Sequence, residues 1–124
     1  MNGQSLKAFL KAGEEAMVGG DYYNAMYYYT TALEFDSTRL DIQYNLAEAS
    51  RYFNAYVPAS EAYQFVLDND SDNQYPDASY KLAVTLQNLG RYEEALDSYN
   101  KAIELNPNNT KAINNRKYVL DKLN

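Results

Sequence analysis

The chain has 124 residues, enough for one domain of ordinary size, and its hydrophobic share of 46% and charged share of 23% are those of a folded globular protein. A net charge of −6 argues against a role on nucleic acid or on an anionic membrane surface, since both require a basic patch. Without cysteine or histidine the chain has no thiolate nucleophile and lacks the commonest metal ligand and general base, so no cofactor is expected.

The N-terminal residues, from Met1 to Ser5, lack the basic and apolar regions of a signal peptide. No apolar run approaches the length of a membrane span. We therefore expect a soluble protein of the cytoplasm or the periplasm with no direct membrane insertion. The sequence does not distinguish between these two compartments.

Apolar residues recur at helical spacing along nearly the whole chain, and this pattern predicts seven helices. The predicted ranges are 5–18, 22–35, 39–53, 57–68, 76–89, 92–105 and 110–123. Asp21 is the expected N-cap of the second helix, and Pro58 lies in the first turn of the fourth, where its missing N–H costs little. Gly20 and Gly90 are expected to end the helices before them, because glycine tolerates positive φ.

A spacing of small and large residues occurs twice, about 70 residues apart, which equals two periods of about 34 residues plus two extra positions. The two copies are Gly20-Asp21-Tyr22 with Ala25, Tyr29, Ala32 and Phe35, and Gly90-Arg91-Tyr92 with Ala95, Tyr99, Ala102 and Leu105. A weaker copy between them is Asn54-Ala55-Tyr56 with Ala59, Tyr63 and Val66. Such a period indicates a helical repeat array, which builds a binding surface rather than a reaction centre.

At these residues the chain resembles the tetratricopeptide repeat, a pair of antiparallel helices. The segment 76–109 follows the family pattern almost position by position, whereas Asn54 stands in the middle repeat where the family usually has glycine. The resemblance implies an all-α right-handed solenoid of three helix pairs with a C-terminal capping helix, forming one domain over 1–124. The expected repeats are 6–39, 40–73 and 76–109, and the expected capping helix is 110–123.

Small residues stand where the two helices of a repeat are expected to cross. These are Ala25, Ala59 and Ala95, with the large side chains of Tyr29, Tyr63 and Tyr99 beside them. A larger residue at such a crossing costs about 1–3 kcal/mol. The large aromatic residue that the family places early in the first helix is Phe9 in the first repeat, but Gln43 and Ser79 in the others. The small residue that follows it one turn later is Gly13, Ala47 or Ala83.

The resemblance further implies a concave groove, lined by the first helix of each repeat, that holds a peptide or helix of a partner protein. The groove-lining positions are Leu10, Glu14, Tyr44, Asn45, Glu48, Tyr52, Tyr80, Lys81, Val84 and Asn88. Tyrosines at these positions would supply stacking area, Asn45 would bond peptide backbone, and Glu48 and Lys81 would set polarity. The alternative is that these side chains only form the solvated face of the first helices.

Chaperone-binding members of the family hold a C-terminal carboxylate with a clamp of two Asn and three basic residues. The corresponding positions here are Leu10, Glu14, Asn45, Asp77 and Lys81. Only Asn45 and Lys81 fit this clamp, while Glu14 and Asp77 would repel a carboxylate. The sequence therefore argues against that specialisation.

Tyr23 and Tyr27 lie one turn apart on the expected convex side of the second helix. They form either a homo-oligomer or partner interface, since clustered exposed aromatics mark interfaces, or amphipathic tyrosines lying along their own helix. The first two repeats also resemble repeats of bacterial cell-envelope proteins associated with secretion. That resemblance implies an alternative function, a structural assembly or self-association segment of a larger protein.

Catalysis has little support, and the protein is not expected to be an enzyme. The adjacent carboxylates at Glu14-Glu15 and Glu93-Glu94 diverge by about 100° on a helix and cannot face one substrate. The segment Asp68-x-Asp70-x-Asp72 starts like a calcium loop but lacks the later glycine and glutamate of that motif. We expect a solvated acidic loop, with Asp72 or Asp77 helping to cap the next helix.

Overall fold

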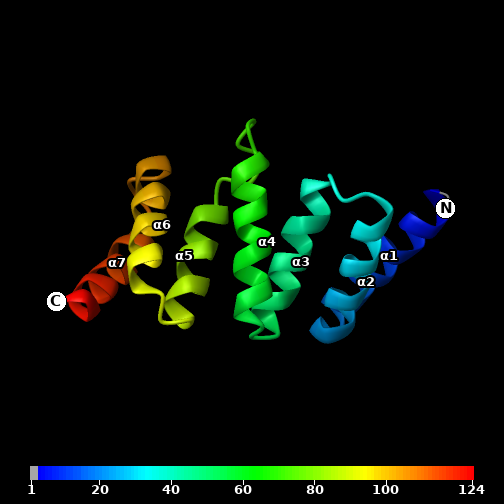
Figure 1. The fold of residues 1–124 in the computed structure, drawn as a ribbon, viewed down its shortest axis with the longest axis horizontal. Coiled ribbons are helices and arrows are strands. Elements are labelled where there is room, and N and C mark those ends of the chain that lie inside the picture. Colours follow the sequence, from blue (N-terminus) through cyan, green and yellow to red (C-terminus); the bar gives the residue numbers. More distant parts are fainter. Residues whose placement is uncertain (1–2) are drawn as a thin grey trace. The chain divides into compact units, whose positions relative to one another are not determined.

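The computed structural model describes residues 3–124, with side chains from Ser5 onwards, and within that range it contains seven helices and no strand (Figure 1). The helices are α1 (Gly3–Val18), α2 (Tyr22–Phe35), α3 (Leu40–Tyr52), α4 (Tyr56–Asn69), α5 (Ala78–Asn88), α6 (Tyr92–Leu105) and α7 (Thr110–Leu123). The all-α prediction is confirmed. Met1 and Asn2, the start of the segment without a signal-peptide pattern, lie outside the described residues. None of the described helices is long and apolar enough to cross a membrane.

The helix ends follow from local chemistry, as the sequence predicts. The carboxylate of Asp21 accepts a hydrogen bond of 3.3 Å from the Asn24 backbone N–H and caps α2. Gly20 and Gly90 both have φ of 75°, the left-handed conformation that glycine adopts without strain. Asn54 takes the same role with φ of 62°, because asparagine is the residue that best replaces glycine there.

The start of α5 differs from the prediction by two residues. The helix begins at Ala78 rather than Pro76, because the carboxylate of Asp70 accepts hydrogen bonds of 2.8 Å from the N–H groups of Gln74 and Tyr75. These bonds hold the preceding loop in a turn. Asp77 occupies the N-cap position but makes no side-chain cap hydrogen bond. The expected capping role of Asp72 or Asp77 is therefore wrong, and Asp70 orders this loop instead.

The described residues divide into two compact units, and the boundary between Phe65 and Val66 falls inside α4. In the first unit α2 packs against α1 and against α3, and in the second unit α6 packs against α5 and α7. The predicted crossing residues Ala25, Ala59 and Ala95 are all fully buried. The tyrosines beside them, at positions 29, 63 and 99, are the largest fully buried side chains.

Candidate functional site

The predicted groove residues lie on α1 and α3 in the first unit and on α5 in the second. The half-buried members are Leu10, Tyr44, Asn45, Glu48, Tyr80, Lys81 and Val84, and the exposed members are Glu14, Tyr52 and Asn88. Every predicted position is thus at least partly open to solvent. The positions on α1 and α3 form one set, in the first unit, and those on α5 form another, in the second.

Tyr44 and Tyr80 each rest on the buried tyrosine of their own repeat. The ring centroids of Tyr44 and Tyr63 are 6.1 Å apart at an interplanar angle of 75°. Those of Tyr80 and Tyr99 are 6.2 Å apart at 57°. Both distances lie in the range of favourable edge-to-face aromatic pairs. The buried ring limits the motion of the outer one, which lowers the entropy that the outer ring would lose on binding a partner.

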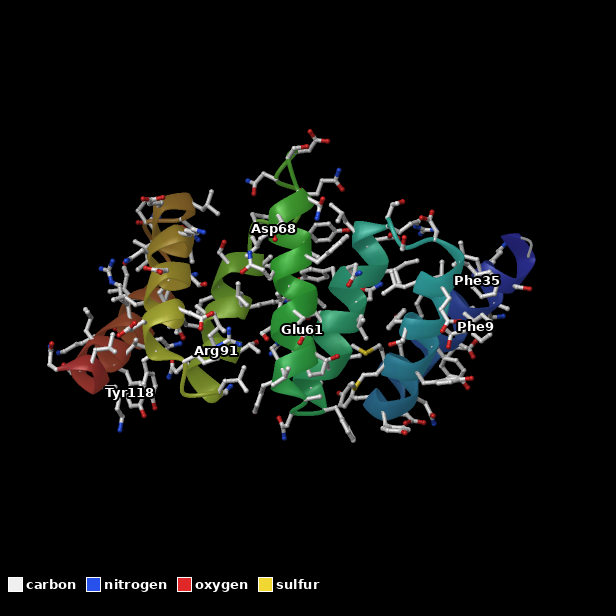
Figure 2. The ribbon with its side chains drawn as sticks, viewed as in Figure 1. Phe9, Phe35, Glu61, Asp68, Arg91 and Tyr118 are labelled. Atoms are coloured by element: carbon white, nitrogen blue, oxygen red, sulfur yellow. The ribbon has the colours of Figure 1, made fainter. Side chains whose placement is uncertain are left out.

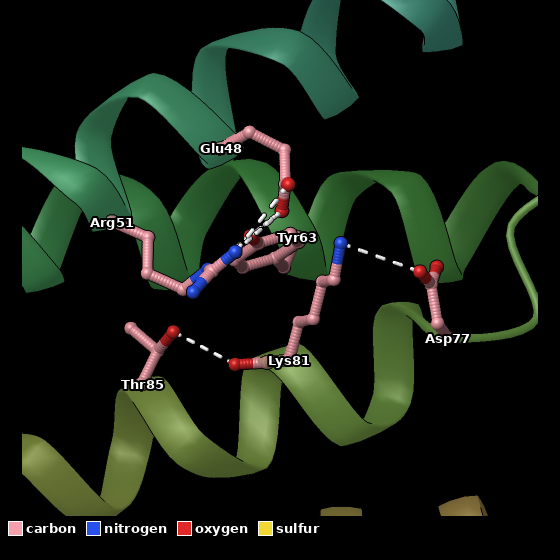
Figure 3. Close-up of polar contacts among 6 residues, drawn as sticks. All are labelled: Glu48, Arg51, Tyr63, Asp77, Lys81 and Thr85. Carbon is pink, nitrogen blue, oxygen red and sulfur yellow. Dashed lines mark hydrogen bonds and ion pairs between the residues drawn. The ribbon is translucent and has the colours of Figure 1, made fainter. Parts of the chain in front are cut away.

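Glu48 is bound to two other side chains within the first unit (Figure 3). The hydroxyl of Tyr63 donates a short hydrogen bond to Glu48, and Arg51 Nε donates one of 2.9 Å to the same hydroxyl oxygen. Arg51 also lies 3.3 Å from Glu48 Oε1. Burial raises the pKa of Tyr63 above its ordinary value, and the hydrogen bond to the Glu48 carboxylate raises it further. Tyr63 is therefore a neutral donor in a closed polar cluster.

Sequence reasoning missed the part that Arg51 and the Tyr63 hydroxyl take in this cluster. One signal was present, because Glu48 and Arg51 carry opposite charges one turn apart on the same face of α3. Gln87 stands in the third repeat where Arg51 stands in the second, and its Oε1 accepts a hydrogen bond of 2.6 Å from the Tyr99 hydroxyl. The buried tyrosines of these two repeats thus both present their hydroxyls to the first helix.

Lys81 and Asp77 form an ion pair of 3.3 Å, one turn apart at the start of the second unit's α5 (Figure 3). The Lys81 charge is therefore partly balanced within its own helix. The side-chain amide of Asn45, by contrast, forms no hydrogen bond within residues 3–124. This half-buried amide has one acceptor and two donors to offer to peptide backbone.

Aromatic rings gather where α2 begins and α3 ends, and we call Tyr22, Tyr23, Tyr52 and Phe53 the aromatic edge; Tyr22 is half-buried and the other three are exposed. Tyr52 stacks on Tyr22 with centroids 5.1 Å apart, and Tyr23 packs against Phe53 at 5.6 Å. Tyr23 is 64% exposed and Phe53 is 49% exposed. Tyr52, predicted as a groove residue, thus packs with this edge. Tyr27 is 58% exposed and packs edge-on against Tyr28.

The acidic segment around Asp70 does not build a metal site in the part of the chain that the structure covers. No group of three or more carboxylates there is arranged to hold an ion. The Asp70 carboxylate is used instead by the backbone of its own loop.

Residues 76–109 match the tetratricopeptide repeat family. The chain is similar to the first tetratricopeptide-repeat domain of Spaghetti (RPAP3) bound to the HSP90 peptide SRMEEVD, with a TM-score of 0.82, 23% identity, and coverage of 99% of this chain and 96% of that chain. It is also similar to the second such domain of human RPAP3 in complex with the HSP70 peptide SGPTIEEVD, with a TM-score of 0.78, 20% identity, and coverage of 94% and 95%.

A third similar structure is the C-terminal tetratricopeptide-repeat domain of an FK506-binding protein from Plasmodium falciparum. Its TM-score is 0.80 at 27% identity, over 97% of this chain and 89% of that chain. No curated protein matches the chain by sequence. Residues 76–109 are thus a tetratricopeptide repeat, and the chain has the all-α fold of tetratricopeptide-repeat domains. The predicted fold class is confirmed, and the predicted repeat is confirmed for residues 76–109.

Proposed function

We propose that the chain is a non-catalytic protein-interaction scaffold that binds a peptide or helix of a partner protein. The residues involved lie on α1 and α3 in the first unit and on α5 in the second. The observation that carries this proposal is the repeated pair in which Tyr44 rests on Tyr63 and Tyr80 rests on Tyr99. A half-buried ring held by a core ring is a suitable anchor for a peptide side chain. Two proteins of the same fold hold peptides of partner proteins.

The charges of this chain favour a peptide of another class than those two. Both of those peptides end in Glu-Glu-Val-Asp. Here Glu14 is exposed on α1, and Lys81 is paired with Asp77 on α5. An acidic C-terminus would meet like charge at Glu14 in the first unit, and in the second unit it would have to compete with Asp77 for Lys81. We therefore propose that the partner offers an internal, neutral or basic segment.

Peptide display with random sequences, carried out once with free and once with blocked C-termini, tests this proposal. Peptides selected on the wild-type protein are titrated against the variants Tyr44→Ala and Tyr80→Ala. Each variant should bind roughly tenfold more weakly, which corresponds to about 1.4 kcal/mol. The matched control is Tyr23→Ala/Tyr27→Ala, which removes exposed rings from α2 and should leave the affinity unchanged.

Two outcomes would contradict the proposal. If both single variants bind the selected peptides as tightly as the wild type does, the tyrosines of α3 and α5 are not anchors. If only peptides with a free acidic C-terminus are selected, the proposed peptide class is wrong while the scaffold function stands. Equal helicity of all variants by circular dichroism is checked first.

A second candidate function is self-association through the aromatic edge, as in an assembly segment of a larger envelope protein. Tyr23 and Phe53 are packed together, yet both residues are exposed to solvent, by 64% and 49%. Association would bury these rings, and apolar burial contributes about 25 cal/mol per Å². Light scattering over a concentration series tests it. A mass that rises with concentration in the wild type and stays monomeric in Tyr23→Ser/Phe53→Ser supports the interface, and a concentration-independent monomer excludes it.

A further inference from the structure

A hollow opens between α3 and α4 within the first unit, and none of the residues proposed above for peptide binding lines it. Its volume is about 290 Å³. It is lined by Gln43, Leu46, Pro58, Glu61, Ala62 and Phe65. Pro58, Glu61 and Phe65 are exposed, so the hollow is open to solvent, while Ala62 at its base is buried.

The first repeat shows what fills the equivalent place. There the ring of Phe9 lies 5.7 Å from the ring of Phe35 and 6.4 Å from that of Tyr28, centroid to centroid (Figure 2). One repeat length further on, these three aromatic residues are replaced by Gln43, Ala62 and Asn69. Gln43 and Ala62 are two of the residues that line the hollow. The hollow therefore includes two positions at which the first repeat has aromatic rings that pack against each other.

The size and walls of the hollow suit one aromatic side chain. An enclosed apolar cavity of about 150 Å³ holds benzene, so this hollow, which is open on one side, has room for one aromatic ring. Leu46 and Ala62 supply apolar wall, and the Phe65 ring supplies an aromatic one. The Gln43 amide offers hydrogen-bonding groups to a hydroxyl or to peptide backbone at the same place.

The charge at the edge of the hollow determines which residues of a partner are favoured next to the entering aromatic side chain. Glu61 is exposed on α4 and makes no ion pair with any residue in the range 3–124 (Figure 2). The chain as a whole carries a net charge of −6. A lysine or arginine next to the entering ring would meet an available carboxylate, whereas an acidic neighbour would be repelled.

We propose that this hollow is a docking site for an aromatic side chain of a partner protein that is flanked by lysine or arginine. The ring takes the place that Phe9 has in the first repeat, and the cation pairs with Glu61. This site lies on the helix pair α3–α4 and is independent of Tyr44 and Tyr80. It gives the scaffold a second contact site, which prefers an aromatic residue next to a basic one.

The test uses three short probe peptides with blocked ends, Lys-Phe-Lys, Lys-Ala-Lys and Glu-Phe-Glu. Binding is followed by NMR through the methyl signals of Leu46 and Ala62, which lie in the wall. Lys-Phe-Lys should shift these signals in a saturable manner, and the other two peptides should bind at least about tenfold more weakly. Equal binding of Lys-Ala-Lys, or no shift of either methyl signal with Lys-Phe-Lys, overturns the proposal.

Two variants test the two parts of the site separately. The double variant Gln43→Phe/Ala62→Tyr installs residues that the first repeat has at these positions, so it should fill the hollow and abolish binding of Lys-Phe-Lys. The variant Glu61→Lys changes only an exposed position and should reverse the preference in favour of Glu-Phe-Glu. If the filled variant does not fold, Glu61→Lys still decides, because an unchanged preference contradicts the proposed role of the charge at the edge of the hollow.

The matched control is Tyr118→Ala, which removes an exposed ring from α7 and should bind Lys-Phe-Lys as the wild type does. Loss of binding in Tyr44→Ala or in Tyr80→Ala, with no effect of Glu61→Lys, would assign the probe to those tyrosines and overturn the docking site. Failure of the probe peptides leaves the outcome of the display selection with Tyr44→Ala and Tyr80→Ala unaffected. The two proposals can therefore fail separately.

Discussion

Gly13 of α1 lies directly against the ring of Tyr29 of α2. A Cβ atom at position 13 would lie 2.6 Å from Cε1 and 2.8 Å from Cζ of that ring. The ring is almost fully buried, so it has no solvent-filled space to move into. Glycine is thus required at position 13 because the Tyr29 ring leaves no room for a Cβ atom. At position 20, by contrast, glycine is favoured by the positive φ of the backbone.

We expect Gly13→Ala to destabilise the protein by about 1–3 kcal/mol, because the methyl group displaces a buried ring. The matched control is Gly19→Ala. A Cβ there would meet only the Glu15 carbonyl oxygen at 3.4 Å and the Ala16 carbonyl oxygen at 3.8 Å, so that substitution should be close to neutral. Urea denaturation followed by circular dichroism measures both. Equal midpoints for Gly13→Ala and the wild type would show that Tyr29 can move aside.

The hydroxyls of Tyr63 and Tyr29 provide a matched pair for testing the polar cluster. Tyr63→Phe should cost about 1–3 kcal/mol, since Glu48 and Arg51 remain partly buried and lose a shared partner. Tyr29 stands at the same position of the first repeat, and its hydroxyl has no hydrogen-bond partner within residues 3–124. Tyr29→Phe should therefore be nearly neutral at neutral pH. Equal losses for the two variants in chemical denaturation would refute a stabilising role for the cluster.

Stability should fall at alkaline pH because a buried tyrosine must ionise. Burial raises the pKa of Tyr29 to about 12, from an ordinary value of 10.0, and the charge of Glu14 adds to the effect. The folded state holds this proton more tightly than the unfolded state does. Its contribution is complete below pH 10 and is lost as pH rises towards 12. Tyr29→Phe should lose less stability than the wild type over this window, measured by urea midpoints at each pH.

Burial also raises the pKa of Tyr63 and that of Tyr99. The Tyr29→Phe variant should therefore still lose some stability at alkaline pH, because Tyr63 and Tyr99 must also ionise. A variant with the same pH dependence as the wild type would show that Tyr29 ionises in the folded protein as readily as in the unfolded chain.

Removing the Ser50 hydroxyl should stabilise the protein. Ser50 is fully buried in α3, and its hydroxyl oxygen has no hydrogen-bond partner among the residues that the structure describes. An unpaired buried polar group costs about 1–3 kcal/mol, so Ser50→Ala should raise the free energy of unfolding by part of that amount. Ser60 is the control, because its hydroxyl donates a hydrogen bond of 2.7 Å to the Val57 carbonyl. A less stable Ser50→Ala would indicate that the hydroxyl is satisfied in solution.

That the chain forms a single domain remains a prediction, and it can be tested by following how the protein unfolds. The boundary of the two compact units falls inside α4, so separating them would interrupt a continuous helix. We expect one cooperative transition, because breaking a helix there would expose hydrogen-bonded backbone and buried apolar residues together. Circular dichroism and tyrosine fluorescence should then give coincident urea curves. Two resolved transitions would mean that the units fold independently.

The predicted groove positions follow from the resemblance to the tetratricopeptide repeat, and the structure leaves each of them at least partly open to solvent. The resemblance alone could not show which neighbouring residues each side chain contacts. Glu48 was expected to meet a partner, yet it bonds Tyr63 and Arg51, and Tyr52 stacks on Tyr22 of another helix. Such contacts depend on which rotamers two packed helices allow, and this information is distributed over both helices.

The seven helices, their ends near Gly20, Asn54 and Gly90, and the repeat family follow from the sequence by itself, because spacing, capping and left-handed turns are local properties of the chain. Only the tertiary structure decided that Gln43 and Ala62 leave a hollow where Phe9 is surrounded by rings in the first repeat. A hollow is a deficit of volume among several helices' side chains, and no residue pattern along one helix records whether its neighbours fill the space.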